Sequence, residues 1–96
     1  MTRCIVLHRS DNVATLIDPA REGDRCALQG EGEGQVTARQ DIAFGHKVCV
    51  ADIAAGAPVR KYGQVIGLAT REIRRGEHAH VHNFDSARAR GDLQAR

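Results

Sequence analysis

The sequence predicts an all-β or mainly β domain, and three observations support this fold class. Apolar residues fall in short runs of strand length instead of a helical pattern. Ten glycines separate these runs. One pattern of eight residues occurs three times and has the form of a strand end, a tight turn and a new strand. Short strands separated by glycine are typical of all-β domains, so we expect at most one short helix.

The apolar runs give the order of the expected strands. They predict strands at residues 5–7, 13–17, 48–50 and 65–69. One of these segments has an alternative. Asp11 and Asn12 are favourable residues for the start of a helix and precede an apolar stretch, so a short helix over residues 11–17 remains open.

The recurring pattern consists of an acidic residue, Ile, two variable residues, Gly, two variable residues and a small apolar residue. It occupies residues 41–48, 52–59 and 72–79. We expect each isoleucine to anchor in the core and each glycine to adopt the positive φ that a tight turn needs. The copies begin 11 and 20 residues apart, which favours a reused turn over a solenoid repeat.

Composition limits the classes of function. With 96 residues and a net charge of +2, the chain is one domain without the basic face of a dedicated nucleic-acid binder. Its aromatic residues are Phe44, Tyr62 and Phe84, too few to form a base-stacking surface. No apolar run is long enough for a signal peptide or a membrane span. We therefore expect a cytoplasmic domain with no nucleic-acid or membrane partner.

The three cysteines are predicted to be reduced. Cys4, Cys26 and Cys49 are odd in number, widely spaced and without a Cys-x-x-Cys pair. Cys49 lies in an apolar run and is expected to be a small core residue. We expect the folded domain to occupy residues 1–85 and residues 86–96 to form a flexible polar tail.

Histidines provide the first candidate site. Three of the five lie at alternate positions, His78, His80 and His82. In a strand, alternate side chains share one face, so the three imidazoles would line up and adjacent ones could chelate a divalent cation. The alternative is a polar strand face exposed to solvent, without a metal.

Two further polar clusters flank expected turn glycines. His46 and Lys47 follow one glycine, where the imidazole can serve as a base or a ligand. Arg60, Lys61 and Tyr62 precede another glycine, and Arg60 can bind a carboxylate or sulfonate through two hydrogen bonds. Strand alternation would place Arg60 and Tyr62 on one side and Lys61 on the other. The alternatives are a solvated turn and an edge strand whose charges discourage aggregation.

Five segments together resemble a known family. They are residues 11–14, 44–48, 52–56, 61–70 and 76–83, and their order and spacing resemble the SAF domain of the altronate/galactarate dehydratase family over residues 4–85. The resemblance implies a β-clip fold. Family members carry this module ahead of a large catalytic region or as a separate small subunit, and a chain of this length looks like the small subunit. Pairing between copies stays open, because exposed strand edges favour it.

The resemblance also implies a reaction. The family removes the β-substituent of a 2-hydroxy acid, so that altronate or galactarate loses water to give a 2-keto-3-deoxy acid. The implied partners are a large catalytic dehydratase subunit and the sugar acid, and the implied metal is Fe²⁺ or Mn²⁺ more than Zn²⁺. Two alternatives remain: the small subunit of a sulfolactate sulfo-lyase, and a non-catalytic module that binds a small carboxylate or a metal.

Roles for the candidate residues follow from the resemblance and from the charge of the intermediate. Removing the proton next to a carboxylate creates a dianionic enediolate, which needs cations or a metal beside it. The expected catalytic residues are His46, Lys47 and Tyr62, the expected substrate-binding residues are Arg60 and Lys61, and the expected metal ligands are His78, His80 and His82.

Overall fold

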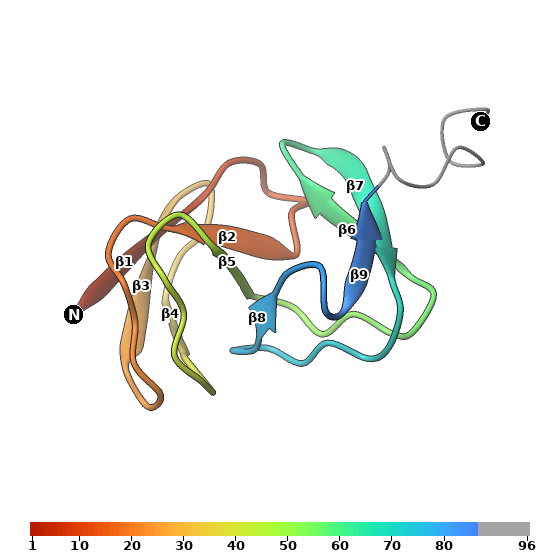
Figure 1. Ribbon diagram of the computed structural model, residues 1–96. Coiled ribbons are helices and arrows are strands. Elements are labelled where there is room, and N and C mark those ends of the chain that lie inside the picture. Colours follow the sequence, from red (N-terminus) through yellow and green to blue (C-terminus); the bar gives the residue numbers. More distant parts are fainter. Residues whose placement is uncertain (87–96) are drawn as a thin grey trace.

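The computed structural model describes residues 1–86, which form nine β-strands and contain no helix (Figure 1). The strands are Thr2–Val6 (β1), Val13–Leu16 (β2), Arg25–Gly30 (β3), Gln35–Thr37 (β4), Lys47–Cys49 (β5), Pro58–Lys61 (β6), Gln64–Ala69 (β7), His78–Ala79 (β8) and Phe84–Ser86 (β9). The all-β prediction is confirmed. Among the described residues, no helix could cross a membrane. Nearly all of the predicted tail lies outside the described residues.

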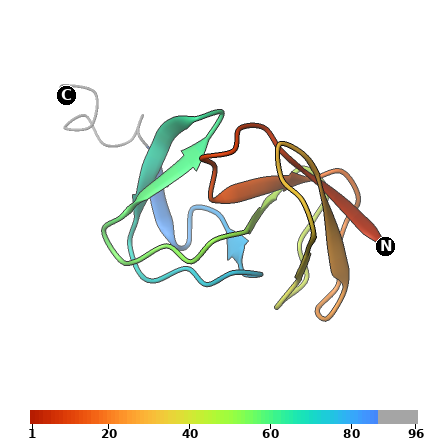
Figure 2. The same cartoon turned by 180° about the vertical axis from the view of Figure 1, so that it is seen from behind.

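The strands form two sheets. The larger has the order β4-β3-β1-β2-β5-β8 and the smaller the order β6-β7-β9. Strands β1 and β3 run parallel, and every other pair is antiparallel. The smaller sheet lies at one end of the molecule and strands β1, β3 and β4 lie at the other (Figures 1 and 2). This arrangement is a small β-clip-like domain, as the family resemblance implies.

Two hydrophobic cores meet at strands β2 and β5. Val13 and Cys49 belong to one core, whereas their neighbours Ala14 and Val48 belong to the other. Successive side chains of a strand point to opposite faces, so both faces of these two strands are buried. Strands β2 and β5 therefore connect the two halves of the domain, and residues at the ends of β5 lie close to both cores.

The recurring turn forms as predicted. Ile42, Ile53 and Ile73 are at most 2% exposed, and each turn glycine has a positive φ. The structure adds a fourth copy at residues 19–26, in which Pro19 and Ala20 take the places of the acidic residue and the isoleucine, and Gly23 has a φ of 91°. Residues 20 and 42 form one antiparallel bridge and residues 53 and 73 form another, so the four turns associate in two pairs.

The alternative of a helix over residues 11–17 is wrong, because Val13–Leu16 is strand β2. The side chains that looked like helix caps bind a distant hairpin instead. Asn12 Oδ1 accepts a hydrogen bond from the Arg60 N–H at 2.7 Å, and Asn12 Nδ2 donates to the Pro58 carbonyl at 3.0 Å. Asp11 binds the N–H groups of Tyr62 and Gly63 at the tip of the same hairpin. This hairpin joins β6 and β7 (Figure 1). These long-range contacts and the pairing of β2 outweigh the local preference for a helix.

The prediction of reduced thiols is confirmed. Cys4, Cys26 and Cys49 are free and buried. Burial raises the pKa of Cys4 to about 12 and that of Cys49 to about 11. At neutral pH these thiols are therefore protonated, and they serve as small apolar core residues.

Candidate functional site

Three imidazoles converge on one point of the fold. Within residues 1–86, His46, His78 and His80 each offer a ring nitrogen, and these nitrogens all lie within 4.8 Å of one another. His46 Nδ1 and His78 Nε2 are 2.9 Å apart, so that one ring donates a hydrogen bond to the other. The ring centroids of His46 and His80 are 4.7 Å apart. We call these three residues the histidine cluster.

Strand pairing brings the cluster together across 32 residues of sequence. His46 immediately precedes β5, and its carbonyl accepts a hydrogen bond from the Leu16 N–H at 2.9 Å. Strand β5 pairs with β8, with Val48 opposite His78. The register of β5 and β8 therefore places the His46 and His78 rings at the same edge of the sheet.

The expected continuous strand through the three alternating histidines is wrong. Strand β8 ends at Ala79, and the chain then turns through residues 80–83. The buried Asn83 holds this turn: its Oδ1 accepts a hydrogen bond from the His80 N–H at 2.9 Å, and its Nδ2 donates to the His78 carbonyl at 2.8 Å. The His80 ring therefore stacks on His78 at an interplanar angle of 10°. His82 contacts His78, with ring centroids 5.2 Å apart, but lies outside the cluster.

The environment of His78 and His80 favours their neutral imidazole forms. Burial is the main cause that lowers the pKa of His78 from 6.5 to about 4, followed by the neighbouring histidines and Lys47. Burial, His46 and Lys47 also lower the pKa of His80. A neutral imidazole has a free nitrogen lone pair and is the form that binds metals. At neutral pH His78 and His80 are therefore in the form that can bind a cation.

Two residues that support the cluster were not found from the sequence. Asn83 fixes the backbone of His78 and His80, as described above. Gln40 Oε1 accepts a hydrogen bond from the His78 N–H at 2.9 Å. Asn83 had a readable signal, since an Asn three residues after His80 can close a turn. Gln40 had none, because its contact joins residues 38 positions apart.

Lys47 takes the opposite face of β5 from the histidines. It pairs with Ala79, a residue of the second core, and its Nζ lies 6.0 Å from the centroid of the Phe84 ring. Burial, and then the charge of Lys61, lowers the pKa of Lys47. Lys61 Nζ in turn lies 5.0 Å from the centroid of the Tyr62 ring. Lys47, Lys61 and Tyr62 thus form a second group, which we call the cationic group.

Arg60 does not share a strand face with Tyr62, contrary to the expectation from alternation. The register of β6 and β7 shifts between Val59 and Arg60, and β6 ends at Lys61. Tyr62 lies in the turn with a φ of 60°, so strand alternation does not extend to it. Arg60 is held through its backbone, because its N–H and its carbonyl both hydrogen bond to Asn12.

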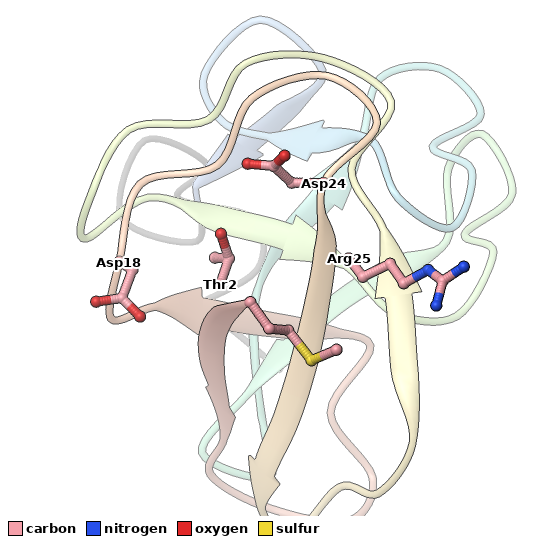
Figure 3. A pocket seen from close by; sticks show the side chains of 5 residues that line it. Thr2, Asp18, Asp24 and Arg25 are labelled. Atoms are coloured by element: carbon pink, nitrogen blue, oxygen red, sulfur yellow. The ribbon is translucent and has the colours of Figure 1, made fainter.

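Hollows on the surface of the described residues include one beside the histidines and one away from them. One lies beside His46 and His78 and is lined also by Pro19, Ala20, Arg21, Asp41, Ile42 and Ala43. The other is lined by Met1, Thr2, Asp18, Asp24 and Arg25 (Figure 3). The latter contains no histidine, and its Asp18 forms an ion pair with Arg3 at 2.8 Å. The hollow beside the histidines is therefore the candidate site.

A small β-domain of paired tight turns with convergent imidazoles at a sheet edge fits the SAF class. A family model described as the altronate/galactarate dehydratase SAF domain matches residues 2–87, and the chain belongs to this family. The chain is 44% identical to altronate dehydratase of Escherichia coli (strain K12) over 79 residues, which cover 82% of this chain and 15% of that protein.

Smaller relatives also match. The chain is 41% identical over 54 residues to (2R)-sulfolactate sulfo-lyase subunit alpha of Chromohalobacter salexigens, a match covering 56% of this chain and 57% of that subunit. The corresponding subunit of Paracoccus pantotrophus is 39% identical over 54 residues, covering 56% of this chain and 81% of that subunit. The chain thus spans about one seventh of the altronate dehydratase it matches and more than half of these two subunits.

Proposed function

We propose that this chain is the small subunit, or SAF module, of a hydro-lyase that converts a sugar acid such as altronate or galactarate to a 2-keto-3-deoxy acid. The observation that carries the proposal is the histidine cluster on the scaffold of this lyase family. The active site is shared with a large catalytic chain, because a domain of 96 residues has little interior for a deep pocket. A cytoplasmic location, expected from the sequence, belongs to this proposal.

The histidine cluster suits a divalent metal. Nitrogen ligands about 2.1 Å from a metal lie roughly 3 to 3.4 Å from one another, and small rotations of the three rings reach this spacing from the present one. His46, His78 and His80 would hold the ion, with His82 beside them. Imidazole ligands suit Fe²⁺ and Zn²⁺, and the family resemblance favours Fe²⁺ or Mn²⁺ over Zn²⁺. A bound ion would act as a Lewis acid on an oxygen of the hydroxy acid.

The cationic group suits the anionic intermediate. In the proposed reaction a proton leaves C2, hydroxide leaves C3 as water, and the resulting enol becomes the 2-keto acid. Lys47 and Lys61 stabilise the carboxylate and the enediolate charge, and Arg60 binds the far end of the acid. The Tyr62 phenol donates a proton to the leaving hydroxide. With His46 at the metal, the base at C2 comes from the large chain.

Exposed apolar side chains on the cluster's own turns support a partner. Phe44, two residues before His46, is 69% exposed, and Val81, between His80 and His82, is 77% exposed. Large apolar side chains exposed beside a candidate site indicate a protein contact more readily than a free surface. The occupant is the large catalytic chain, which covers this edge of the sheet and closes the site.

A second candidate function has its own support. The matches to sulfo-lyase subunits cover 57% and 81% of those proteins, which are separate small chains, whereas the altronate dehydratase is matched over only 15% of its length. The same residues could serve the elimination of sulfite from 3-sulfolactate, because a sulfonate also binds Lys and Arg side chains.

The test is reconstitution of the complex. The chain is co-expressed with a large catalytic chain of the dehydratase type, and separately it replaces the matched region of the Escherichia coli altronate dehydratase. Each complex is assayed for keto-acid formation from altronate, galactarate and 3-sulfolactate. Activity on a sugar acid supports the hydro-lyase, and activity on sulfolactate supports the sulfo-lyase. Inactivity of both complexes on all three acids would contradict both functions and favour a binding module.

Measurements of metal binding distinguish whether His46 is a metal ligand or the catalytic base. We expect His46→Ala and His80→Ala to lose Mn²⁺ binding in calorimetry, while His8→Ala, a histidine outside the cluster, keeps it. Loss of activity with unchanged metal affinity in His46→Ala would assign His46 as the base instead of a ligand.

A further inference from the structure

Tyr62 has an unusual backbone. Among residues 1–86 it is the only non-glycine residue with a positive φ, at 60°, and the residue is 61% exposed. A bulky side chain is strained in this conformation, and glycine would adopt it freely. The next residue, Gly63, also has a positive φ, of 72°. Strained residues of this kind persist where the surroundings hold them and are frequent at functional sites.

Asp11 makes the hydrogen bonds that hold the backbone of Tyr62. Its side chain is buried and reaches the β6–β7 hairpin from the loop between β1 and β2. Asp11 Oδ2 accepts hydrogen bonds from the N–H groups of His8 and Tyr62, both at 3.1 Å. Asp11 Oδ1 accepts one from the Gly63 N–H at 2.8 Å. One carboxylate thus binds the two consecutive amides of the strained turn.

We propose that Asp11 is a positioning residue for the reaction, which holds the Tyr62 backbone in its left-handed conformation and so places the phenol beside Lys61. This inference rests on the proposed function, in which Tyr62 protonates the leaving group. Asp11 itself is buried and does not touch the substrate. The left-handed backbone conformation of Tyr62 sets the direction of its side chain. An extended backbone would point the phenol elsewhere and separate its ring from Lys61 Nζ, which now lies 5.0 Å from the ring centroid.

The holding action is tested on the chain itself. In Asp11→Asn, one carboxylate oxygen becomes an NH₂ group that faces backbone N–H donors, so at least one of the hydrogen bonds is lost. We expect the amides of Tyr62 and Gly63 to exchange with deuterium about 10-fold faster or more. The control is Asp24→Asn, since Asp24 accepts a hydrogen bond from the Arg21 N–H at 2.9 Å in a turn without a distant hairpin. Unchanged exchange at Tyr62 and Gly63 in Asp11→Asn overturns the inference, whether or not the complex is active.

The catalytic consequence is tested by a double-mutant cycle in the reconstituted complex. Tyr62→Phe removes the proton donor and is expected to lower kcat about 100-fold or more. Asp11→Asn is expected to lower kcat at least about 10-fold with little change in KM, and to have no further effect when Tyr62→Phe is already present.

The outcomes distinguish the positioning role of Asp11 from the proposed dehydratase function. Equal losses from Asp11→Asn in the wild-type background and in the Tyr62→Phe background would show a general structural effect and overturn the positioning role. Full activity of Tyr62→Phe in an active complex would also overturn it, while leaving the dehydratase function standing. Failure of the wild-type complex on every acid contradicts the proposed function instead, and the exchange measurement then still decides whether Asp11 holds the turn.

Discussion

Replacing Asn83 by alanine tests whether a single side chain builds the histidine cluster. Asn83 is 3% exposed and makes two hydrogen bonds to backbone groups of the residues that carry the imidazoles. Asn83→Ala leaves the His80 N–H and the His78 carbonyl without these partners. The turn at residues 80–83 then keeps only its backbone hydrogen bonds, such as that from the Asn83 N–H to the His80 carbonyl at 3.0 Å.

The expected magnitude follows from these two bonds. Each contributes about 0.5–1.5 kcal/mol net, and a buried group left unpaired costs about 1–3 kcal/mol. Because both sites are partly buried, water can replace part of the loss, and we expect the free energy of unfolding to fall by about 2 kcal/mol. Residues that orient metal ligands typically affect affinity 10- to 100-fold, so we expect the Mn²⁺ dissociation constant to rise by about that factor.

Asn12→Ala is the matched control. Asn12 holds the backbone of residues 58 and 60 with the same pair of bonds, one accepted by Oδ1 and one donated by Nδ2. We expect a similar loss of stability in urea denaturation and no change in Mn²⁺ affinity by calorimetry. Wild-type affinity in Asn83→Ala would refute the argument that this turn sets the ligand geometry. An equal loss of affinity in Asn12→Ala would instead trace the effect to general destabilisation.

Three further predictions follow from the structure. His78 has a folded-state pKa of about 4 against 6.5 when unfolded, so the unfolded chain binds more protons and stability should fall as pH drops from 6.5 towards 4. The urea midpoint at the two ends of this range measures the fall, which should be smaller in the control variant His78→Gln, where the lowered pKa of His80 still contributes. Gly45 has open space around the position of a Cβ, so Gly45→Ala should lower the free energy of unfolding by about 1 kcal/mol, for its positive φ alone. Gly76→Ala should lower it by about 2–4 kcal/mol, because the new Cβ also meets the Thr37 carbonyl. Equal losses in thermal unfolding would refute the packing argument. The three buried thiols, with raised pKa values, should react with a disulfide reagent only after denaturation, and rapid reaction of the native chain would contradict their burial.

The sequence predicted the turns better than the strands. The three copies with isoleucine were readable because the same two requirements, a core anchor and a positive φ, recur at fixed spacing. The fourth copy was missed because Ala20 fills the place of the isoleucine, where it forms a bridge with Ile42. Strands β3 and β4 were missed as well, since Arg25–Gly30 and Gln35–Thr37 gain their stability from pairing and show little apolar alternation of their own.

Local helix preference gave a wrong alternative for residues 11–17, where polar side chains bind partners far away in the sequence. Asp11 and Asn12 have the composition of a helix cap, but their partners lie 46 to 52 residues away in the chain. No local pattern carries that information. A simpler signal was available in the turns that close on a side chain, because Asp11 and Asn83 each accept a hydrogen bond from the N–H three residues earlier.

The candidate site shows why adjacency in sequence is a poor guide to shared chemistry. His46 and Lys47 are neighbours, yet strand alternation sends Lys47 towards Phe84 and the second core, while the His46 ring meets His78. The residues that contact one another come instead from turns 32 positions apart, brought together by the register of β5 and β8. A small hydroxy acid that uses both the imidazoles and the ammonium groups must therefore lie across the end of β5. The hollow beside His46 and His78 is lined by neither Lys47 nor Lys61, which is the physical reason why the proposed function needs a larger chain to complete the site.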